Sequence, residues 1–226
     1  LAIELAAARL PMLGVQALHD MLAQRLALLW HRRADLPPRQ QALQAALDWS
    51  CGLLSTAELH ALQGLSIFAA GFRLDSALSV IGSMPEANAL DLLASLVDRS
   101  LVHVEQRDPP RYRLLETTRL HAAQGLALSD VADSARARWR AAMAELARAC
   151  ESEFWWLDDE TWIGRFLSDQ PNLEAAYDEC IEQREVGSAG AIGQALHRLD
   201  DMRSLGGAVR QRKRSALALA MDPASD

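Results

Sequence analysis

Two short segments of alternating apolar and polar residues lie next to each other in a chain that otherwise shows helical periodicity. Residues 101–106 have the sequence LVHVEQ, residues 111–115 have the sequence RYRLL, and Pro109 and Pro110 separate them. A period of two predicts half-buried strands, and proline ends a strand. Alanine and leucine, both strong helix formers, dominate the rest of the chain. We therefore expect a mainly α-helical fold with one short β-hairpin.

Three helices are expected directly before the hairpin. The first begins at the sequence STAE, residues 55–58, which has the form of a capping box between Ser55 and Glu58. The second is short, with Asp75 or Ser76 as its cap, and the third covers about residues 88–99. Their apolar inner positions are Leu59, Leu62, Leu65, Ala77, Leu78, Ile81, Leu90, Leu93, Leu96 and Val97. Three helices followed by a hairpin is the order of a winged helix.

Helical patterns continue on both sides of this unit. Before it, helices are expected over about residues 14–30 and 42–52. After it, two apolar stripes and a pair of final helices near 188–203 and 207–221 are expected. The stripes consist of Trp139, Met143, Leu146 and Cys150, and of Leu173, Tyr177, Cys180 and Ile181.

The sequence contains no recognisable catalytic or metal-binding motif. A phosphate-binding GxxxxGK[ST], a GxGxxG and a GxSxG are all absent, and the six histidines are scattered. Cys51, Cys150 and Cys180 are far apart and odd in number, which indicates reduced thiols and a cytoplasmic protein. The acidic run 158–160 is expected to cap a helix. We therefore expect neither an enzyme nor a metal site in this chain, and no membrane span.

The third helix argues against DNA reading. Its charged residues are Asp91, Asp98 and Arg99, with Glu86 just before them, and the chain as a whole has a net charge of −7. A helix that enters the major groove normally exposes Arg, Lys, Asn or Gln. We expect a surface suited to protein contact, while a DNA-binding winged helix with a helical dimerisation arm stays open as the alternative.

Two further clusters are candidate interaction sites. A tryptophan-rich corner could hold a ligand or partner. A basic cluster near the end could contact phosphate or acidic protein, although the solvated face of a last helix is the favoured interpretation. These residues are Trp155, Trp156 and Trp162, and Arg210, Arg212, Lys213 and Arg214.

Several consecutive segments resemble one family. LAIELAAARL, LPPRQQALQAALDWSCGLLSTAE, LSIFAAGFRLDSA, LDLLASLVDRSLVHVE and YRLLETTR are similar to the part that follows the nucleotide-binding core of bacterial signal-transduction ATPases of the STAND class, which are related to the NB-ARC ATPases. Within this class, the sequence similarity is to large transcriptional regulators. The resemblance covers residues 1 to about 125, and WIGRFLSDQPNLEAAYDECIE extends it more weakly.

The resemblance implies a domain order and a function. Residues 1–48 would be the small helical domain after the family's GLPL motif, which would end at Leu1; residues 49–125 would be the winged helix and 126–226 a helical domain. The chain would be a non-catalytic arm that couples signal sensing to the ATP or ADP state of the parent protein, with no cofactor of its own. The stretch 126–134 is a candidate hinge.

The family's histidine that senses nucleotide phosphate is missing. Leu115 stands at its place, in the sequence LLE, and Leu cannot hydrogen-bond a phosphate. Arg113 is a candidate substitute, although a solvent-facing strand arginine is the simpler interpretation. Glu116 replaces the family's Asp and could cap a helix or bind a basic neighbour.

The end of the chain resembles a degenerate tetratricopeptide repeat. Gly206, Ala218 and Pro223 keep the spacing of such a repeat, but Gln211 and Ser215 stand where small and aromatic residues are expected. A single repeat cannot bury both its faces, so further helical repeats are expected downstream. The implied partners are the parent's nucleotide-binding domain, those repeats, and a protein or small-molecule inducer, with oligomerisation of the parent and no direct DNA contact.

Overall fold

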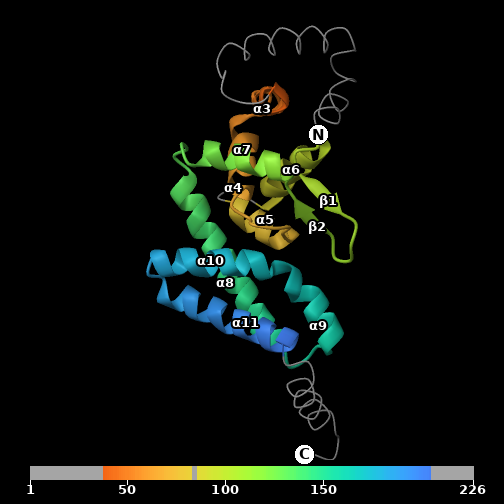
Figure 1. Cartoon of the computed structure of the whole chain (residues 1–226), viewed down its shortest axis with the longest axis vertical. Coiled ribbons are helices and arrows are strands. Elements are labelled where there is room, and N and C mark those ends of the chain that lie inside the picture. The colour runs from red at the N-terminus through yellow and green to blue at the C-terminus, as the bar shows by residue number, and fades with distance from the viewer. Residues whose placement is uncertain (1–37, 83–85, 205–226) are drawn as a thin grey trace, which may run out of the picture. The chain divides into compact units, whose positions relative to one another are not determined.

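The computed structural model describes residues 38–82 and 86–204 (Figure 1). Helices dominate, and the described part of the chain contains one two-stranded antiparallel sheet, which confirms the expected fold class. The expected helices over 14–30 and 207–221 and the basic cluster at 210–214 lie outside the described residues. The elements are α3 (Pro38–Cys51), α4 (Thr56–Leu65), α5 (Leu74–Ile81), α6 (Glu86–Asp98), β1 (His103–Glu105), β2 (Arg111–Arg113), α7 (Glu116–Leu126), α8 (Ala132–Glu153), α9 (Asp159–Phe166), the 3-10 helix η1 (Leu167–Asp169), α10 (Gln170–Glu182) and α11 (Val186–Ser204).

The chain forms two compact units. The first ends at Ala135, within α8, and the second continues from Arg136. Residues 68–72, which connect α4 to α5 in the sequence, belong to the second unit. The domain boundaries expected at 49 and 126 stay predictions, as does the hinge at 126–134, where the structure has α7 end at Leu126 and α8 begin at Ala132.

In the described part of the chain, the five helices α3 to α7, the hairpin and the first residues of α8 build the first unit. Helix α4 packs against α5, α6 and α7, and α5 packs against α6. Of the ten expected inner positions, five are buried and four are half-buried, but Leu90 is 47% exposed, so its assignment to the core is wrong. The apolar stripe of α6 is wider than the side of the helix that its neighbours cover. The completely or almost completely buried residues include Leu62, Leu65, Ala77, Val80, Leu93, Leu96, Leu101 and Val102.

Helix α5 begins differently from the expectation. Its N-cap is Arg73, which makes no side-chain cap hydrogen bond, so neither Asp75 nor Ser76 caps the helix. The Asp75 carboxylate instead accepts from the Ser76 amide, with 2.8 Å between Oδ1 and N. A carboxylate in the first turn still stabilises the helix through its dipole.

The two strands of the hairpin are shorter than the segments 101–106 and 111–115 that the alternating pattern predicts. Strands β1 and β2 pair in a register that places Val104 opposite Tyr112. Leu101 and Val102, expected in the first strand, instead donate their amides to the Leu96 carbonyl at 3.0 and 3.2 Å. Ser100 between them and α6 has φ of 58°, and this left-handed residue ends the helix in a Schellman-like turn. Leu101 and Val102 therefore belong to the turn that ends α6, and β1 begins only at His103.

The capping box of α4 is confirmed. The Ser55 amide donates to Glu58 Oε2 at 2.7 Å, and the Glu58 amide donates to Ser55 Oγ at 3.3 Å. The Glu58 carboxylate also reaches α6, where Ser95 Oγ donates to Oε1 and Arg99 Nε lies 3.2 Å from the same oxygen. The hydrogen bond from Ser95, with those from Ser55 and the charge of Arg99, lowers the pKa of Glu58 from 4.5 to about 2. One carboxylate thus joins the start of α4 to the end of α6.

Glu58→Gln is expected to lower the free energy of unfolding at pH 7 by about 1–2 kcal/mol, because hydrogen bonds to a charged group are stronger than those to a neutral amide. The folded state binds a proton at Glu58 less readily than the unfolded state, so this contribution is complete above pH 4.5 and is lost as the pH falls toward 2. Denaturant titrations across this range should therefore show a weaker pH dependence for the variant. Glu145→Gln is the control, since the exposed Glu145 pairs with Arg148 at the surface of α8. An equal effect of both changes would contradict the assignment.

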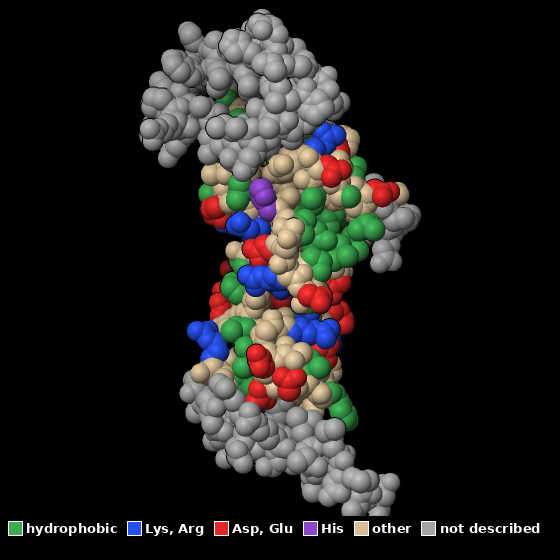
Figure 2. Space-filling model, turned by 90° about the vertical axis from the view of Figure 1, so that its right-hand side faces the viewer, with side chains coloured by type: hydrophobic (Ala, Val, Ile, Leu, Met, Phe, Trp, Pro, Cys, Tyr) green, Lys and Arg blue, Asp and Glu red, His purple; other side chains and the backbone are tan. Residues whose placement is uncertain are grey.

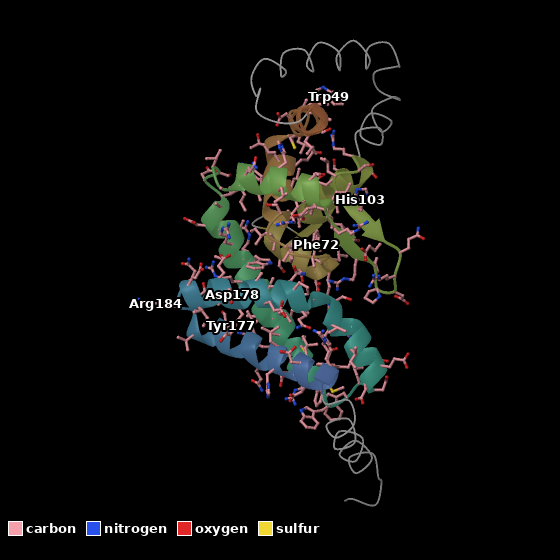
Figure 3. All side chains as sticks on the ribbon, in the orientation of Figure 1. Trp49, Phe72, His103, Tyr177, Asp178 and Arg184 are labelled. Atoms are coloured by element: carbon pink, nitrogen blue, oxygen red, sulfur yellow. The ribbon has the colours of Figure 1, made fainter. Side chains whose placement is uncertain are left out.

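The second unit is built from α8, α9, α10 and α11. The expected stripe of α8 is confirmed, because Trp139, Met143, Leu146 and Cys150 are all buried. The stripe of α10 is confirmed at Leu173 and Cys180, but Ile181 is 54% exposed, since it lies beside the buried face rather than on it. Tyr177 of α10 (Figure 3) is close to α11, and a Cβ at Gly193 would lie 3.1 Å from its ring. The missing side chain at Gly193 allows this approach.

Candidate functional site on the winged helix

Helix α6 occupies the place of the recognition helix in a winged helix, and its exposed face is acidic. Among the described side chains, those exposed on α6 are Asn88, Leu90, Asp91, Ala94 and Asp98, and none of them is basic. Arg99, directly after the helix, is half-buried and directed to Glu58. The face that would meet DNA in a groove-reading protein therefore carries two carboxylates and no cation, as the sequence predicted.

A groove of about 220 Å³ lies between α6 and the hairpin. Apolar side chains line most of it, and Asp98 is the charged residue of the lining. The sequence did not reveal this groove, because helical periodicity placed Leu90 in the core. Figure 2 shows a gathering of hydrophobic side chains on the face of this unit that carries the hairpin. The apolar residues of the lining are Leu90, Leu93, Ala94, Val97, Val104 and Tyr112.

The arginines of the hairpin are engaged on its other face. Glu105 Oε1 lies 3.2 Å from Arg113 Nε, and Glu105 Oε2 lies 3.3 Å from Arg107 Nε. In an antiparallel pair, alternate residues point to opposite faces, so Glu105 and Arg113 lie opposite the face of Val104 and Tyr112. His103, labelled in Figure 3, shares the face of Arg113. The apolar groove therefore receives none of these charges.

The two candidate nucleotide-sensing residues bind different neighbours. Arg113 is directed to Glu105, whereas Glu116 accepts two hydrogen bonds from Arg119, both at 2.8 Å. The hydrogen bond from Arg119 lowers the pKa of Glu116. Glu116 is the first residue of α7, and Leu115 is its N-cap without a side-chain cap hydrogen bond. The structure thus places Glu116 with a basic neighbour, and a nucleotide contact of either residue stays a prediction.

The tryptophan-rich corner divides into core and surface. Trp162 is completely buried and donates its indole N–H to the Cys150 carbonyl at 2.9 Å, so it belongs to the core of the second unit. Trp155 and Trp156 are exposed, and the Arg198 guanidinium lies 5.8 Å from the centre of the Trp155 ring. The structure therefore does not bring the three tryptophans together at one surface. The expected acidic cap is confirmed, since Asp158 accepts from the Thr161 amide at 2.9 Å.

Residues 38–82 and 86–204 hold no group of three or more His, Cys, Asp or Glu side chains that could bind a metal ion. Over the same residues, no helix has the length and apolar character to cross a membrane. Cys51, Cys150 and Cys180 are all free thiols, and burial raises the pKa of Cys51 to about 11.

Comparison with known proteins agrees with this geometry. Residues 54–127 match the family model of a winged helix-turn-helix domain. The chain is 33% identical over 202 residues to a "Putative HTH-type transcriptional regulator" of Mycobacterium tuberculosis (strain ATCC 25618 / H37Rv). The aligned residues are 87% of this chain and 22% of that protein. A protein of the same name from Mycobacterium bovis has the same identity and coverage.

A second type of relative covers less of the chain. An "Uncharacterized protein" of Mycobacterium tuberculosis is 38% identical over 144 residues, which are 62% of this chain and 37% of that protein. The chain thus spans about a fifth to somewhat more than a third of the length of these relatives. No solved structure matches the chain. Residues 54–127 form a winged helix-turn-helix domain, in a chain that is similar over most of its length to a segment of HTH-type transcriptional regulators.

Proposed function

We propose that this chain is a regulatory segment of a transcriptional regulator and that its winged helix contacts polypeptide rather than DNA. The observation that carries the proposal is the exposed face of α6, where Asp91 and Asp98 are the charged residues among the described side chains. Protein–DNA affinity depends on cations that neutralise phosphates, and a pair of carboxylates at the recognition position opposes it. The similarity to transcriptional regulators supports the regulatory role.

The finer proposal is that the segment is the arm of a STAND-type ATPase. It would couple sensing by downstream helical repeats to the ATP or ADP state of a nucleotide-binding domain elsewhere in the parent, by moving the winged helix between two states. The length of the relatives leaves room for such domains, because this chain matches only 22% of the regulator. A two-state element of this kind needs a free-energy difference of only a few kcal/mol. We place the parent in the cytoplasm and expect it to oligomerise when an inducer binds.

The alternative is direct DNA binding by the winged helix. The domain type and the names of the relatives favour it. The hairpin also carries Arg107 and Arg113, which are more than half and about half exposed, although both are directed to Glu105. In this alternative the hairpin would contact phosphates while α6 contributes little.

A DNA-binding titration separates these functions. Fluorescence anisotropy of a labelled random-sequence duplex is measured with increasing chain at about 50 and 200 mM salt, since phosphate contacts make affinity fall by orders of magnitude over that range. We expect no salt-sensitive binding at micromolar protein. The control is the double variant Arg107→Ala, Arg113→Ala: binding by the natural chain that this variant loses would refute the proposal and identify the hairpin as a phosphate contact.

A further inference from the structure

The groove of the winged helix is an exposed apolar surface with a defined shape. Leu93 forms a buried floor, being 1% exposed, and Leu90 and Val104 stand on the two sides at 47% and 41% exposure. Large apolar side chains that gather at one concavity usually mark a contact site, whereas isolated ones need no explanation. The concavity at α6 therefore has room for a small number of apolar side chains from another molecule.

Two independent periodicities direct apolar residues into this groove. On α6, Leu90, Ala94 and Val97 follow one another at steps of four and three residues, so they form one stripe along the helix. On the hairpin, Val104 and Tyr112 are register partners and lie on the same face. A groove lined by a helical apolar stripe and by the apolar face of a hairpin can accept the apolar face of another helix.

The exposed charges of α6 next to the groove are acidic, since Asp98 lines it and Asp91 directly follows the lining residue Leu90. Asp91 and Asp98 are exposed and seven residues apart, about 10 Å along the helix axis, and Asp98 itself lines the groove. No ion pair joins either of them to another residue in the described part of the chain. The nearest cation in sequence, Arg99, is directed to Glu58. An occupant with positive charges two helical turns apart would meet both carboxylates.

We propose that this groove binds an amphipathic helix of a partner polypeptide whose apolar face is flanked by Arg or Lys. The proposal deepens the proposed function and rests on it, because a winged helix that reads DNA would have its α6 face occupied by the duplex. Apolar side chains at three- and four-residue spacing fill the groove, and the flanking cations meet Asp91 and Asp98. Specificity comes from the charges, since a helix flanked by Glu would face two carboxylates at close range.

The test uses two designed peptides as probes. Both are fluorescein-labelled helices of about 15 residues with leucines at every third or fourth position and alanine elsewhere; one carries lysines beside the leucines, and the other carries glutamates there. Anisotropy titrations with the whole chain give their dissociation constants. We expect the lysine peptide to bind at least about tenfold more tightly than the glutamate peptide, with the difference shrinking at high salt.

Variants assign the binding to the groove. Leu90→Glu and Ala94→Glu each place a carboxylate on the apolar stripe at an exposed position, so both should fold, as circular dichroism checks. Both should weaken lysine-peptide binding by about tenfold or more, because the new carboxylate loses its water when leucines pack against it, and this cost exceeds the gain from its attraction to the exposed lysines. Asp91→Asn with Asp98→Asn should reduce the preference for lysine over glutamate. Leu128→Glu is the matched control, because Leu128 is 92% exposed in the same unit and lies outside the groove.

Each outcome decides the proposal. Loss of lysine-peptide binding in the two groove variants and its retention in Leu128→Glu would support it. No binding, equal binding of both peptides, or equal effects of Leu90→Glu and Leu128→Glu would overturn it. The DNA titration distinguishes failure of the groove proposal from failure of the proposed function. If the chain binds neither peptide nor DNA, only the groove proposal fails. If the chain binds DNA and Leu90→Glu abolishes that binding, both the groove proposal and the proposed function fail.

Discussion

Replacement of Trp162 by alanine is expected to lower the free energy of unfolding of the second unit by about 3–5 kcal/mol. The side chain is completely buried, and its ring centre lies 5.3 Å from that of Phe154 and 5.7 Å from that of Phe166. Alanine would leave a large cavity among these rings and would leave the Cys150 carbonyl without its indole donor. Urea unfolding followed by circular dichroism measures the loss.

The neighbouring tryptophan provides a matched control. Trp156 is 78% exposed, so Trp156→Ala should change the same free energy by no more than about 0.5 kcal/mol. Trp162→Phe separates packing from hydrogen bonding, because it keeps most of the ring volume and removes the N–H; we expect it to cost less than alanine but more than the change at Trp156. Equal stabilities of Trp162→Ala and Trp156→Ala would show that the corner is not divided into core and surface as described.

Asn172→Ala is expected to lower the free energy of unfolding by about 2–4 kcal/mol. The Asn172 amide is fully buried, accepts from the Ala70 amide at 3.0 Å and donates to the Gly71 carbonyl at 2.9 Å. Both part-buried backbone groups would lose this hydrogen bond, and each such loss costs about 1–2 kcal/mol. The residue therefore fixes the segment 68–72, in which the Phe68 and Phe72 rings stack at 4.4 Å.

Limited proteolysis gives this prediction a local readout. Phe68 and Phe72 are almost completely buried, and both are chymotrypsin targets once the segment opens. Asn172→Ala should accelerate cleavage there, while Asn88→Ala, at an exposed asparagine of α6, should leave it unchanged. Unchanged cleavage and unchanged stability in the Asn172 variant would contradict the role assigned to its two hydrogen bonds.

Local signals in the sequence predicted the elements well. The capping box at Ser55 and Glu58, the acidic cap at Asp158 and the hairpin follow from residue types a few positions apart, because the interactions concerned are themselves local. The acidity of α6 was also readable, since no tertiary contact changes the charge of Asp91 or Asp98. These local features carry the proposed function.

Features that depend on tertiary contacts were not predictable. Residues 68–72 have the composition of a turn, yet they are held by Asn172, about one hundred positions away. The contacts of Glu58 with Ser95 and Arg99 join two helices whose packing the sequence does not reveal. The exposure of Leu90, and with it the groove, depends on which side of α6 its neighbours cover. Helical periodicity alone placed both Leu90 and Leu93 in the core, whereas in the structure Leu93 is buried and Leu90 is exposed.

The central claim is that the α6 face meets polypeptide rather than DNA, and cross-linking from that face tests it most directly. The photoreactive amino acid p-benzoylphenylalanine is introduced at the exposed position 94 of the protein in cells, with the same substitution at position 128 as control, and the cells are irradiated. We predict a position-94 adduct that protease removes and nuclease does not. An adduct that nuclease removes, or no more cross-linking than at position 128, would contradict the claim.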